Sequence, residues 1–541
     1  MTTPDVAEVE AVGDPPAPAA RRGASTDRRR AFGMMFGTFV VVLAGLVAYT
    51  MSVQDGVFTY ALDDAAIHLT LARNLVHHGT FGIVPGTYQS ASSSPIWEVL
   101  LGPLLLLTGD AEWTPLVLNV IAAGWALWTF SRLPLLQRLA AEGLGRVAVV
   151  ALPLGLGLVP LALSGMEHTL HLAVTVQVLA LLVDRLREEA VRAYVPMALL
   201  IAFGTLVRFE TGFLAVAVAI VLVAVPVGEP ARRRLGAAAM LVAAAVVPVA
   251  GFAIMNRAFG QYALPNSVVA KTPIGQKGLP IPTLAEFVDK LLSDPVLVIA
   301  LLIGVAVLVL RARPRPRDLV TLVPLTVMLL TTGAHVLFAE IGWFERYQAY
   351  LIAGLLFGVL TAIGPITSAD GRRRAALLLA AACVLRVPLL VNTPIATNNV
   401  YETEHHLGQF LRDNYPGEGV AVNDIGYVSW MHEGDVVDMV GLASYDMLKA
   451  RKDGALSRAQ TGAVLDAHGV RVMAVHDEFF DGIVPVGWPA AGRWCLTTRR
   501  LAVSSACVTF YAPAGAEHDR LRAALRAYAP RLPPSIEVSG G

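Results

Sequence analysis

Charged residues are scarce in this chain of 541 residues: they make up 16% of it, whereas 55% of its residues are hydrophobic. Soluble domains usually carry about 25% charged residues. The composition therefore excludes an ordinary soluble protein and predicts a polytopic α-helical membrane protein. An excess of either charge is also lacking, since 42 basic residues balance 42 acidic ones. A nucleic-acid phosphate backbone requires a basic surface, so nucleic acid is not expected as a partner.

Cysteine is rare too, with three residues in the whole chain. Cys383 lies in an apolar segment, whereas Cys495 and Cys507 lie near the C-terminus. The latter two could form a disulfide if this region is extracytoplasmic, or they could remain two free thiols. The spacing does not decide between these two states.

Long apolar runs, by contrast, are abundant. Eleven segments are predicted as membrane spans, although several fall short of the roughly 20 residues of an untilted span: Phe32–Met51, Pro115–Phe130, Val147–Leu163, Thr169–Val183, Val195–Val207, Gly212–Val227, Ala237–Met255, Val296–Leu310, Val320–Ala339, Ala349–Ile363 and Ala375–Val391. The first follows three arginines and lacks a small-residue cleavage site, so we expect a signal anchor. Residues 1–31 are predicted to be a disordered, basic cytoplasmic tail.

A further apolar stretch, Pro95–Leu107, is short and contains Pro103, so it is predicted to be an interfacial or re-entrant helix. If it does not cross, all basic loops fall on one side, which the positive-inside rule identifies as the cytoplasm. These loops are Arg21–Arg30, Arg132–Arg146, Arg185–Arg192, Arg232–Arg234, Arg311–Arg317 and Arg372–Arg374. We therefore expect a multi-pass plasma-membrane protein with a cytoplasmic N-terminus and a long first outer loop, residues 52–114.

The pattern changes after residue 391, where helix-like segments begin to alternate with short β-like runs. Residues 392–541 are accordingly predicted to form an extracytoplasmic α/β domain that follows a transmembrane domain of residues 32–391. The helix-like segments are Glu402–Asn414, Ser457–His468 and Ala516–Ala529, and the β-like runs are Gly419–Val422, Val436–Met439, Val470–Val475, Arg500–Val503 and Cys507–Tyr511.

Polar residues gather at the outer ends of the predicted spans, and such a convergence at one membrane face indicates a functional site. They are Asp63, Asp64, Glu167, His168, Arg208, Glu210, Asn266, Lys271, Glu345 and Arg346. The pair Asp63-Asp64 opens a helix-like stretch that Gly79 would end. One of the two could cap this helix, and the other could accept a proton from a sugar hydroxyl or stabilise positive charge at an anomeric carbon.

Several short motifs resemble, in order, those of the GT-C membrane glycosyltransferases. The similarity is greatest to the branch that contains the mycobacterial arabinofuranosyltransferases, which use decaprenyl-phosphoryl arabinose. The motifs are Leu62-Asp63-Asp64 through Leu75, Gly79-Thr80-Phe81-Gly82, Ser92 through Trp97, Ser164-Gly165-Met166-Glu167, Val207-Arg208-Phe209-Glu210, Leu264-Pro265-Asn266-Ser267 with Ala270-Lys271, Glu345-Arg346-Tyr347, Asn423-Asp424 and Val437-Asp438. Met166, Phe209 and His168 depart from the family pattern.

The resemblance implies a polyprenyl-phosphate donor that carries one sugar, used on the outer side of the membrane. A phosphate leaving group needs cations, for which Lys271 and Arg346 are the first candidates and Arg208 the third. Asp63 is the expected catalytic carboxylate, and Asp64 would assist it or bind the acceptor. Residues expected to bind the sugar or the acceptor are Glu167, His168, Asn266, Glu345 and Tyr347.

Each of these residues also has a structural explanation. The cations could be interface anchors, Glu167 could favour a helix start, Glu210 could pair with Arg208, and Asn266 could belong to a turn. No cofactor is firmly implied. A divalent cation could sit at the acidic pair with the donor phosphate, whereas the pattern Glu402, Glu404, His405, His406 is better explained as a solvated helix face.

The sequence thus predicts a GT-C glycosyltransferase that moves one sugar, arabinofuranose by resemblance, from a polyprenyl phosphate to a cell-envelope glycan. The C-terminal domain is expected to hold this acceptor. The alternatives are a mannosyltransferase that uses polyprenyl-phosphate mannose, a transporter or flippase of lipid-linked sugars, and a glycan-binding protein without catalysis. Neither a Walker loop nor a dinucleotide fingerprint occurs, which disfavours a nucleotide-sugar donor.

Overall fold

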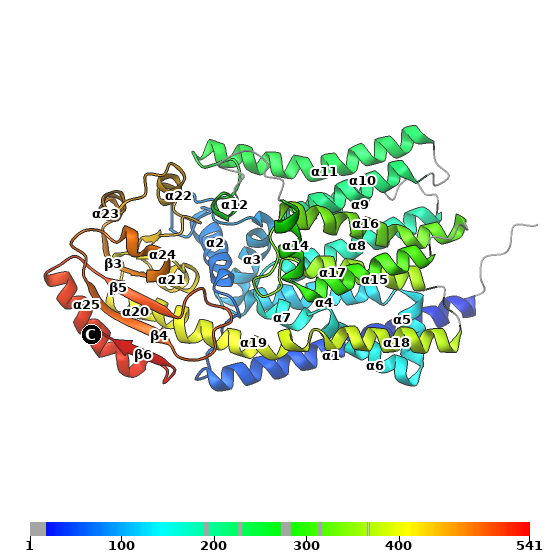
Figure 1. Ribbon diagram of the computed structural model, residues 1–541, viewed down its shortest axis with the longest axis horizontal. Coiled ribbons are helices and arrows are strands. Elements are labelled where there is room, and N and C mark those ends of the chain that lie inside the picture. The colour runs from blue at the N-terminus through cyan, green and yellow to red at the C-terminus, as the bar shows by residue number, and fades with distance from the viewer. Residues whose placement is uncertain are drawn as a thin grey trace, which may run out of the picture.

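The computed structural model describes residues 18–188, 194–225, 230–271, 283–311, 316–364, 366 and 368–540. A bundle of helices forms one part of the molecule, and a sheet covered by helices lies at one end of this bundle (Figure 1). The beginning of α1 and the loop regions around α5 and α18 lie at the opposite end, so the basic loops near these helices point away from the sheet (Figure 1).

The helices before the sheet follow the predicted order. They are α1 (Pro18–Val53), α2 (Asp64–His78), α3 (Pro95–Thr108), α4 (Thr114–Phe130), α5 (Pro134–Ala141), α6 (Gly143–Gly155), α7 (Leu158–Leu163), α8 (His168–Glu188), α9 (Tyr194–Val207), α10 (Thr211–Ala224), α11 (Ala231–Ala258), α12 (Asn266–Lys271), α14 (Leu284–Leu292), α15 (Pro295–Arg311), α16 (Pro316–Phe338), α17 (Ala349–Ile363), α18 (Ala369–Val384), α19 (Val387–Val400) and the π-helix η2 (Tyr401–His405).

All eleven predicted spans coincide with helices. By length and composition, six helices of the described residues could cross a membrane, or up to eight if each of two bent pairs is one span. Three further spans correspond to the shorter apolar helices α9, α10 and α17. The structure therefore confirms a polytopic helical protein, while the number of crossings stays a prediction. The stretch predicted as interfacial or re-entrant is α3, which lies next to α2 at the sheet end of the bundle (Figure 1).

The C-terminal part contains a six-stranded sheet of order β2-β1-β3-β5-β4-β6. Strands β2, β1 and β3 are parallel, and the other pairings are antiparallel. Its elements are α20 (His406–Asn414), β1 (Gly419–Val422), α21 (Gly426–Met431), β2 (Val436–Asp438), α22 (Tyr445–Lys452), α23 (Arg458–Ala467), β3 (Val470–Val475), α24 (Asp477–Phe480), η3 (Asp481–Ile483), β4 (Ala490–Leu496), β5 (Cys507–Tyr511), α25 (Ala516–Tyr528), η4 (Ala529–Arg531) and β6 (Ile536–Ser539).

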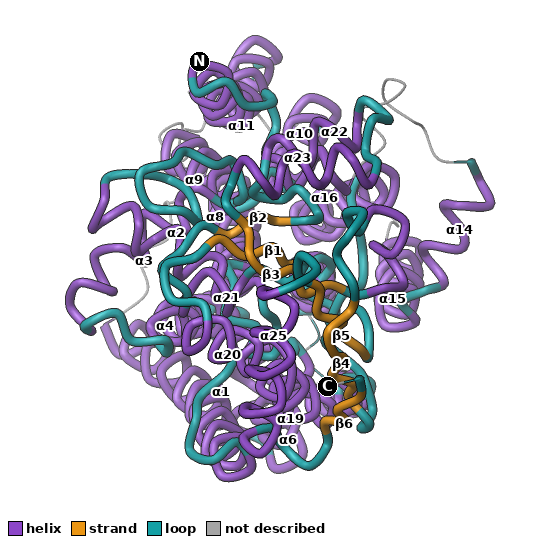
Figure 2. The backbone as a smooth tube through the Cα atoms, turned by 90° about the vertical axis from the view of Figure 1, so that its left-hand side faces the viewer, coloured by secondary structure: helices purple, strands orange, loops and turns teal. Residues whose placement is uncertain are grey.

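Each face of this sheet has its own apolar core. Helices α20, α21 and α25 lie on one side of the strands, and α22 and α23 lie on the other (Figure 2). The core beneath α20, α21 and α25 also includes Leu71, Ile83 and Ala91, which belong to residues 52–114, the segment predicted to be the first outer loop and called the outer loop below. This loop is therefore packed into the C-terminal domain, in addition to its covalent link with the bundle.

Hydrogen bonds reinforce the contact between the first outer loop and α21. The Tyr60 N–H donates to the Tyr427 hydroxyl at 3.3 Å, and the Arg73 guanidinium donates to the Trp430 carbonyl at 2.9 Å. The Trp430 indole N–H in turn donates to Glu112 at 3.0 Å. The outer loop and the sheet domain thus hold each other in a defined orientation.

Most predicted elements of the C-terminal domain are confirmed, but one predicted strand is wrong, and helices α21, α22 and α24 and two strands were not predicted. The predicted strand Arg500–Val503 is wrong, because this segment is a loop in which the Leu501 N–H bonds to the side chain of Asn399 rather than to a strand. Strands β4 and β6 were not predicted. The glycine and arginine within β4 weaken its sequence pattern, and a register shift interrupts its pairing with β5.

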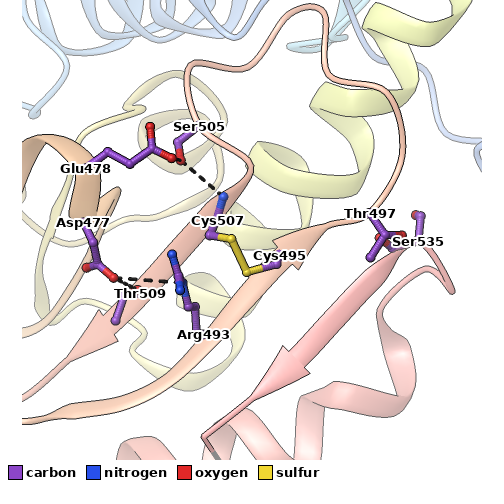
Figure 3. The surroundings of a disulfide bond; sticks show 9 residues. All are labelled: Asp477, Glu478, Arg493, Cys495, Thr497, Ser505, Cys507, Thr509 and Ser535. Carbon is purple, nitrogen blue, oxygen red and sulfur yellow. Dashed lines mark hydrogen bonds and ion pairs between the residues drawn. A yellow bond between two sulfur atoms is a disulfide. The ribbon is translucent and has the colours of Figure 1, made fainter.

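Cys495 and Cys507 form a disulfide that joins β4 to β5, so the alternative of two free thiols is wrong (Figure 3). The Cys507 N–H bonds to the Ser505 hydroxyl at 3.3 Å, and this hydroxyl donates to Glu478 at 3.0 Å (Figure 3). Cys383 is free and buried. A structural disulfide is typical of oxidising compartments.

Removing this disulfide is expected to destabilise the C-terminal domain by about 3 kcal/mol, because a bond over a short loop restricts the unfolded chain. The test is thermal unfolding of Cys495→Ala/Cys507→Ala in detergent, compared with Cys383→Ala, which leaves the bond in place. Reductant should lower the melting temperature of the wild type but not that of the double variant. Equal melting temperatures with and without reductant would contradict a structural bond.

Candidate active site

Asp63 lies where the outer loop meets the C-terminal domain. Its carboxylate makes no capping bond to its own helix, so the expectation that it caps α2 is wrong for this side chain. Instead it accepts the backbone N–H groups of Gly426 at 2.6 Å and Tyr427 at 2.8 Å, at the start of α21. Gly79 does end α2, in the left-handed conformation that favours glycine.

The contact between Asp63 and α21 requires glycine at position 426, because any side chain there would collide with Asp63. A Cβ at this position would lie 2.1 Å from the Asp63 carbonyl oxygen and 2.6 Å from Oδ1 of its carboxylate. Both distances are well below any non-bonded contact. The close approach of the two segments therefore depends on a glycine at the start of α21.

Asp64 faces the loop between α16 and α17. The Arg346 guanidinium donates to its Oδ2 at 3.1 Å and lies 3.5 Å from Oδ1, while the same guanidinium donates to the Tyr347 hydroxyl at 2.9 Å. The Arg346 side chain is 2% exposed and that of Asp64 is 27% exposed. Asp64 thus remains accessible, while its partner is buried.

The segment before Arg346 has an unusual backbone. Trp343, Phe344 and Glu345 all have positive φ, at 44°, 63° and 55°. Residues other than glycine adopt such angles at a cost, and these positions gather at functional sites. Glu345 forms an ion pair with Arg386, which lies at the start of α19.

Polar residues also follow the parallel strands of the sheet. Asn423 and Asp424 come directly after β1, and His476 comes directly after β3. The Asn423 amide donates to Oδ2 of Asp424 at 2.9 Å, and Nε2 of His476 lies 3.3 Å from the same oxygen. The carboxyl ends of parallel strands meet at one sheet edge, which is the common place for a site in such sheets.

A cavity of about 970 Å³ separates this sheet edge from the acidic pair, and we call it the interdomain cavity. Six carboxyl side chains and two arginines line it: Asp63, Asp64, Glu340, Glu404, Asp424, Glu478, Arg346 and Arg451. Its remaining lining is largely apolar and includes Trp343, Phe479 and Phe480. Aromatic rings and carboxylates together are suited to a polyhydroxylated ligand.

The carboxyl groups of this cavity influence each other. Burial, followed by the charge of nearby carboxylates, raises the pKa of Asp63 and of Asp424 to about 7. The two backbone N–H groups stabilise the charged form of Asp63. Burial, with the charges of Asp424 and Asp63, also raises the pKa of Glu404, so the titrations of these three carboxyl groups influence one another.

A second cavity, of about 280 Å³, lies among α2, α10, α11, α12 and the end of α16, and we call it the helix cavity. Arg208 and His68 line it, together with apolar residues of three predicted spans, namely Phe213, Val249 and Phe338. Asp64, Arg346 and Tyr347 line both cavities. The two spaces therefore meet at the Asp64–Arg346 ion pair.

Arg208 is held by two carboxylates. It donates to both oxygens of Glu210, at 2.5 and 3.1 Å, and to Glu167 at 3.0 Å. Burial would raise the pKa of the Glu167 carboxyl, but His168, His68 and Arg208 together hold it below its usual range. Tyr347 lies between the two arginines, with its ring centre 5.5 Å from the Arg208 guanidinium carbon and 4.9 Å from that of Arg346.

The structure thus brings together seven of the ten expected site residues at, or directly behind, the walls of the two cavities. Asp63, Asp64, Arg208, Arg346 and Tyr347 line a cavity, while Glu167 and His168 are buried behind Arg208 and Tyr347.

The other three expected residues lie differently. Asn266 is buried, donates to Gln261 at 3.2 Å and lines neither cavity. Glu345 points to Arg386 instead of the cavities. Only the backbone of Lys271, at the end of α12, is described, and its side chain lies outside the described residues. Its contact with a phosphate stays a prediction.

The sequence left open a divalent cation at the acidic pair and explained Glu402, Glu404, His405 and His406 as a solvated helix face rather than a cation site. Among the described residues, no three His, Cys, Asp or Glu side chains are placed to hold a metal ion. At the acidic pair, both Asp63 oxygens already accept backbone N–H groups. Glu402, Glu404, His405 and His406 are buried, so the solvated helix face expected for them is wrong.

Sequence comparison gives little beyond this geometry. A family model described as a domain of unknown function (DUF8728) matches residues 397–511, which contain most of the sheet. No curated protein matches the chain.

Comparison with solved structures is more informative. ArnT from Cupriavidus metallidurans, in its crystal structure bound to undecaprenyl phosphate, superposes with a TM-score of 0.55 at 11% identity, over 89% of this chain and 99% of ArnT. The chain has the GT-C fold. The archaeal oligosaccharyltransferase AglB from Archaeoglobus fulgidus gives a TM-score of 0.48 at 11% identity, over 90% of this chain and 77% of AglB.

Helices at the sheet end of the bundle, α2 and α3, belong to the first outer loop, and the C-terminal domain closes over them (Figure 1). Both cavities lie in this layer between bundle and sheet.

Proposed function

We propose that this protein is a glycosyltransferase that transfers one sugar from a polyprenyl-phosphate donor to a cell-envelope glycan at the outer face of the membrane. The observation that carries this proposal is the meeting of the two cavities at Asp64 and Arg346. A transferase must bring its two substrates to one catalytic carboxylate. Asp64 and Arg346 line both cavities, so a molecule bound in either cavity could contact Asp64.

The helix cavity suits the donor. Arg208 and Arg346 offer guanidinium donors to a phosphate, and Phe213, Val249 and Phe338 offer apolar contacts to a prenyl chain. The resemblance in fold to ArnT, which was crystallised with undecaprenyl phosphate, supports a lipid of this kind. The motif resemblance favours arabinofuranose as the sugar over mannose.

The interdomain cavity suits the acceptor. Its six carboxyl groups outnumber its two arginines, so an anionic acceptor would be repelled. The acceptor that this cavity favours is therefore a neutral, hydroxyl-rich glycan. Trp343 and Phe479, which are 47% and 59% exposed, offer aromatic faces to its sugar rings.

In the transfer step, the acceptor hydroxyl oxygen bonds to the anomeric carbon, and the bond between this carbon and the phosphate oxygen breaks. The phosphate leaves with the electron pair, stabilised by Arg346 and Arg208. The hydroxyl proton passes to Asp64. Binding of the donor phosphate to Arg346 competes with the ion pair between Arg346 and Asp64, and the Asp64 carboxylate then accepts this proton.

The orientation proposed from the basic loops places both cavities outside the cytoplasm. The disulfide in the C-terminal domain supports this, because such bonds persist in oxidising compartments. The described residues that line the site all lie at the sheet end of the bundle, opposite the start of α1 (Figure 1).

The experiment is transfer by the purified protein in liposomes, with labelled polyprenyl-phosphate arabinofuranose or mannose and neutral cell-envelope glycans. We expect labelled glycan from the arabinofuranose donor. Arg346→Gln should weaken binding of undecaprenyl phosphate by at least about tenfold, since it removes a charge-assisted contact of about 1.5–3 kcal/mol. Movement of the donor across the bilayer without transfer would instead identify a flippase.

A further inference from the structure

His68 is a buried histidine that reaches the helix cavity. It lies on α2, one helical turn after Asp64, and these two positions share a helix face. The side chain is 7% exposed and is one of the residues that line the helix cavity. None of the motifs that indicate function assigns it a role.

Two carboxylates flank the His68 ring. Its Nδ1 lies 2.6 Å from Oε1 of Glu98, on α3, whose side chain is fully buried. Its Nε2 lies 3.6 Å from Oε2 of Glu167, which precedes α8 and is also fully buried. The first distance is a hydrogen bond and the second is too long to be one.

Glu98 requires a positive partner. Its other oxygen, Oε2, has no hydrogen-bond partner among the described residues. A fully buried carboxylate is costly unless it is paired and hydrogen-bonded. A protonated His68 supplies both the charge and the bond.

The charges around His68 favour its protonated form. Burial lowers the pKa of the imidazole, but Glu98, then Glu167 and Asp64, raise it above the ordinary value of 6.5. Arg208, which lines the same cavity, is bonded to Glu167 and Glu210. The surrounding carboxylates therefore favour the cationic form of His68.

We propose that His68 is a third cationic ligand of the donor phosphate, fixed by Glu98 through Nδ1 and donating from Nε2 into the helix cavity. This inference rests on the proposed function, since it concerns the same donor. Nε2 faces Glu167 at 3.6 Å, too far for a hydrogen bond, and the His68 side chain lines the helix cavity together with Arg208 and Arg346. The leaving phosphate gains a negative charge as its bond to the sugar breaks, and this charge would be met by three cations rather than two.

The test is the pH dependence of undecaprenyl phosphate binding and of transfer, measured above pH 7. The second pKa of a phosphate monoester is about 6, so the phosphate itself is already fully deprotonated in this range. In the wild type, binding should weaken as the pH rises through the pKa of His68. In His68→Gln, binding at pH 7 should be about tenfold weaker and should no longer depend on pH in this way. In Glu98→Gln, the fall should begin at a lower pH, because the main charge that keeps His68 protonated is gone.

His77→Gln is the matched control. His77 lies on the same helix, is exposed, pairs with Asp110 and lines neither cavity. It should retain the wild-type profile. A residue needed only for folding would lower activity equally at every pH, so melting temperatures are measured alongside.

The two proposals fail in distinguishable ways. If the wild type neither binds undecaprenyl phosphate nor transfers sugar, the proposed function is wrong. If it does both, and either His68→Gln or Glu98→Gln keeps the wild-type pH profile, His68 is not a ligand of the phosphate.

Discussion

Asp64→Asn is expected to lower the rate of sugar transfer by about 10²- to 10⁴-fold, the usual contribution of a carboxylate that acts as a general base. Asp64 is accessible and lines both cavities, so it can contact donor and acceptor at once. The amide cannot accept the hydroxyl proton. Undecaprenyl phosphate binding should be retained, because the substitution releases Arg346 from its ion pair. The measurement is kcat for transfer together with the Kd for undecaprenyl phosphate.

Two further variants, Asp110→Asn and Asp63→Asn, test whether the loss of transfer is specific to Asp64. Asp110 is a partly exposed partner of His77 outside both cavities, so its substitution should leave kcat unchanged. Asp63, which the sequence suggested as the catalytic residue, has both oxygens bonded to α21 and is now proposed to position Asp64. If Asp64→Asn transferred sugar normally and Asp63→Asn did not, these two roles would be reversed.

Gly426→Ala is expected to reduce transfer by about 10²-fold through misplacement of the acidic pair. The new methyl group would lie 2.1 Å from the Asp63 carbonyl oxygen, so α21 and the outer loop must move apart. A shift of about 1 Å at a reacting group can cost this much. The measurement is kcat for transfer, with the melting temperature as a check on folding.

Gly462→Ala is the matched control for this substitution. Gly462 lies on α23 in the same domain, and a Cβ there would make only an ordinary contact, 3.6 Å from Pro485. It should leave both transfer and stability close to wild type, since alanine favours a helix. Normal transfer by Gly426→Ala would show that the C-terminal domain does not position the acidic pair.

The sequence predicted the helical elements well because membrane helices leave a local signal. Each of the eleven apolar runs can be recognised without its neighbours, although several are shorter than a full span, and each falls on helices over its described residues. Strands β1 and β3, which are buried and apolar, were equally clear. Strand β4 was not, because its pattern depends on partners that are distant in sequence.

The sequence predicted many of the residues that form the candidate site, but not the contacts that these residues make. Convergence of Asp64, Arg208 and Arg346 could be expected from their common side of the membrane. The bond between Asp63 and the start of α21 could not, because the two segments are 363 residues apart. For the same reason the sequence did not reveal that Glu345 pairs with Arg386 or that His68 pairs with Glu98. His68 and Glu98 could have been noticed as ionisable residues in apolar surroundings.

The most direct test of the account is an experimental structure of the full chain with undecaprenyl phosphate. We predict the phosphate in the helix cavity, within hydrogen-bond distance of Arg346 and on the side of Arg208, with the prenyl chain running past Phe213 and Val249. Asp64 should then be released from Arg346 and face the interdomain cavity. A phosphate bound at the opposite end of the bundle, or on the C-terminal domain away from Asp64, would contradict the proposed transfer site.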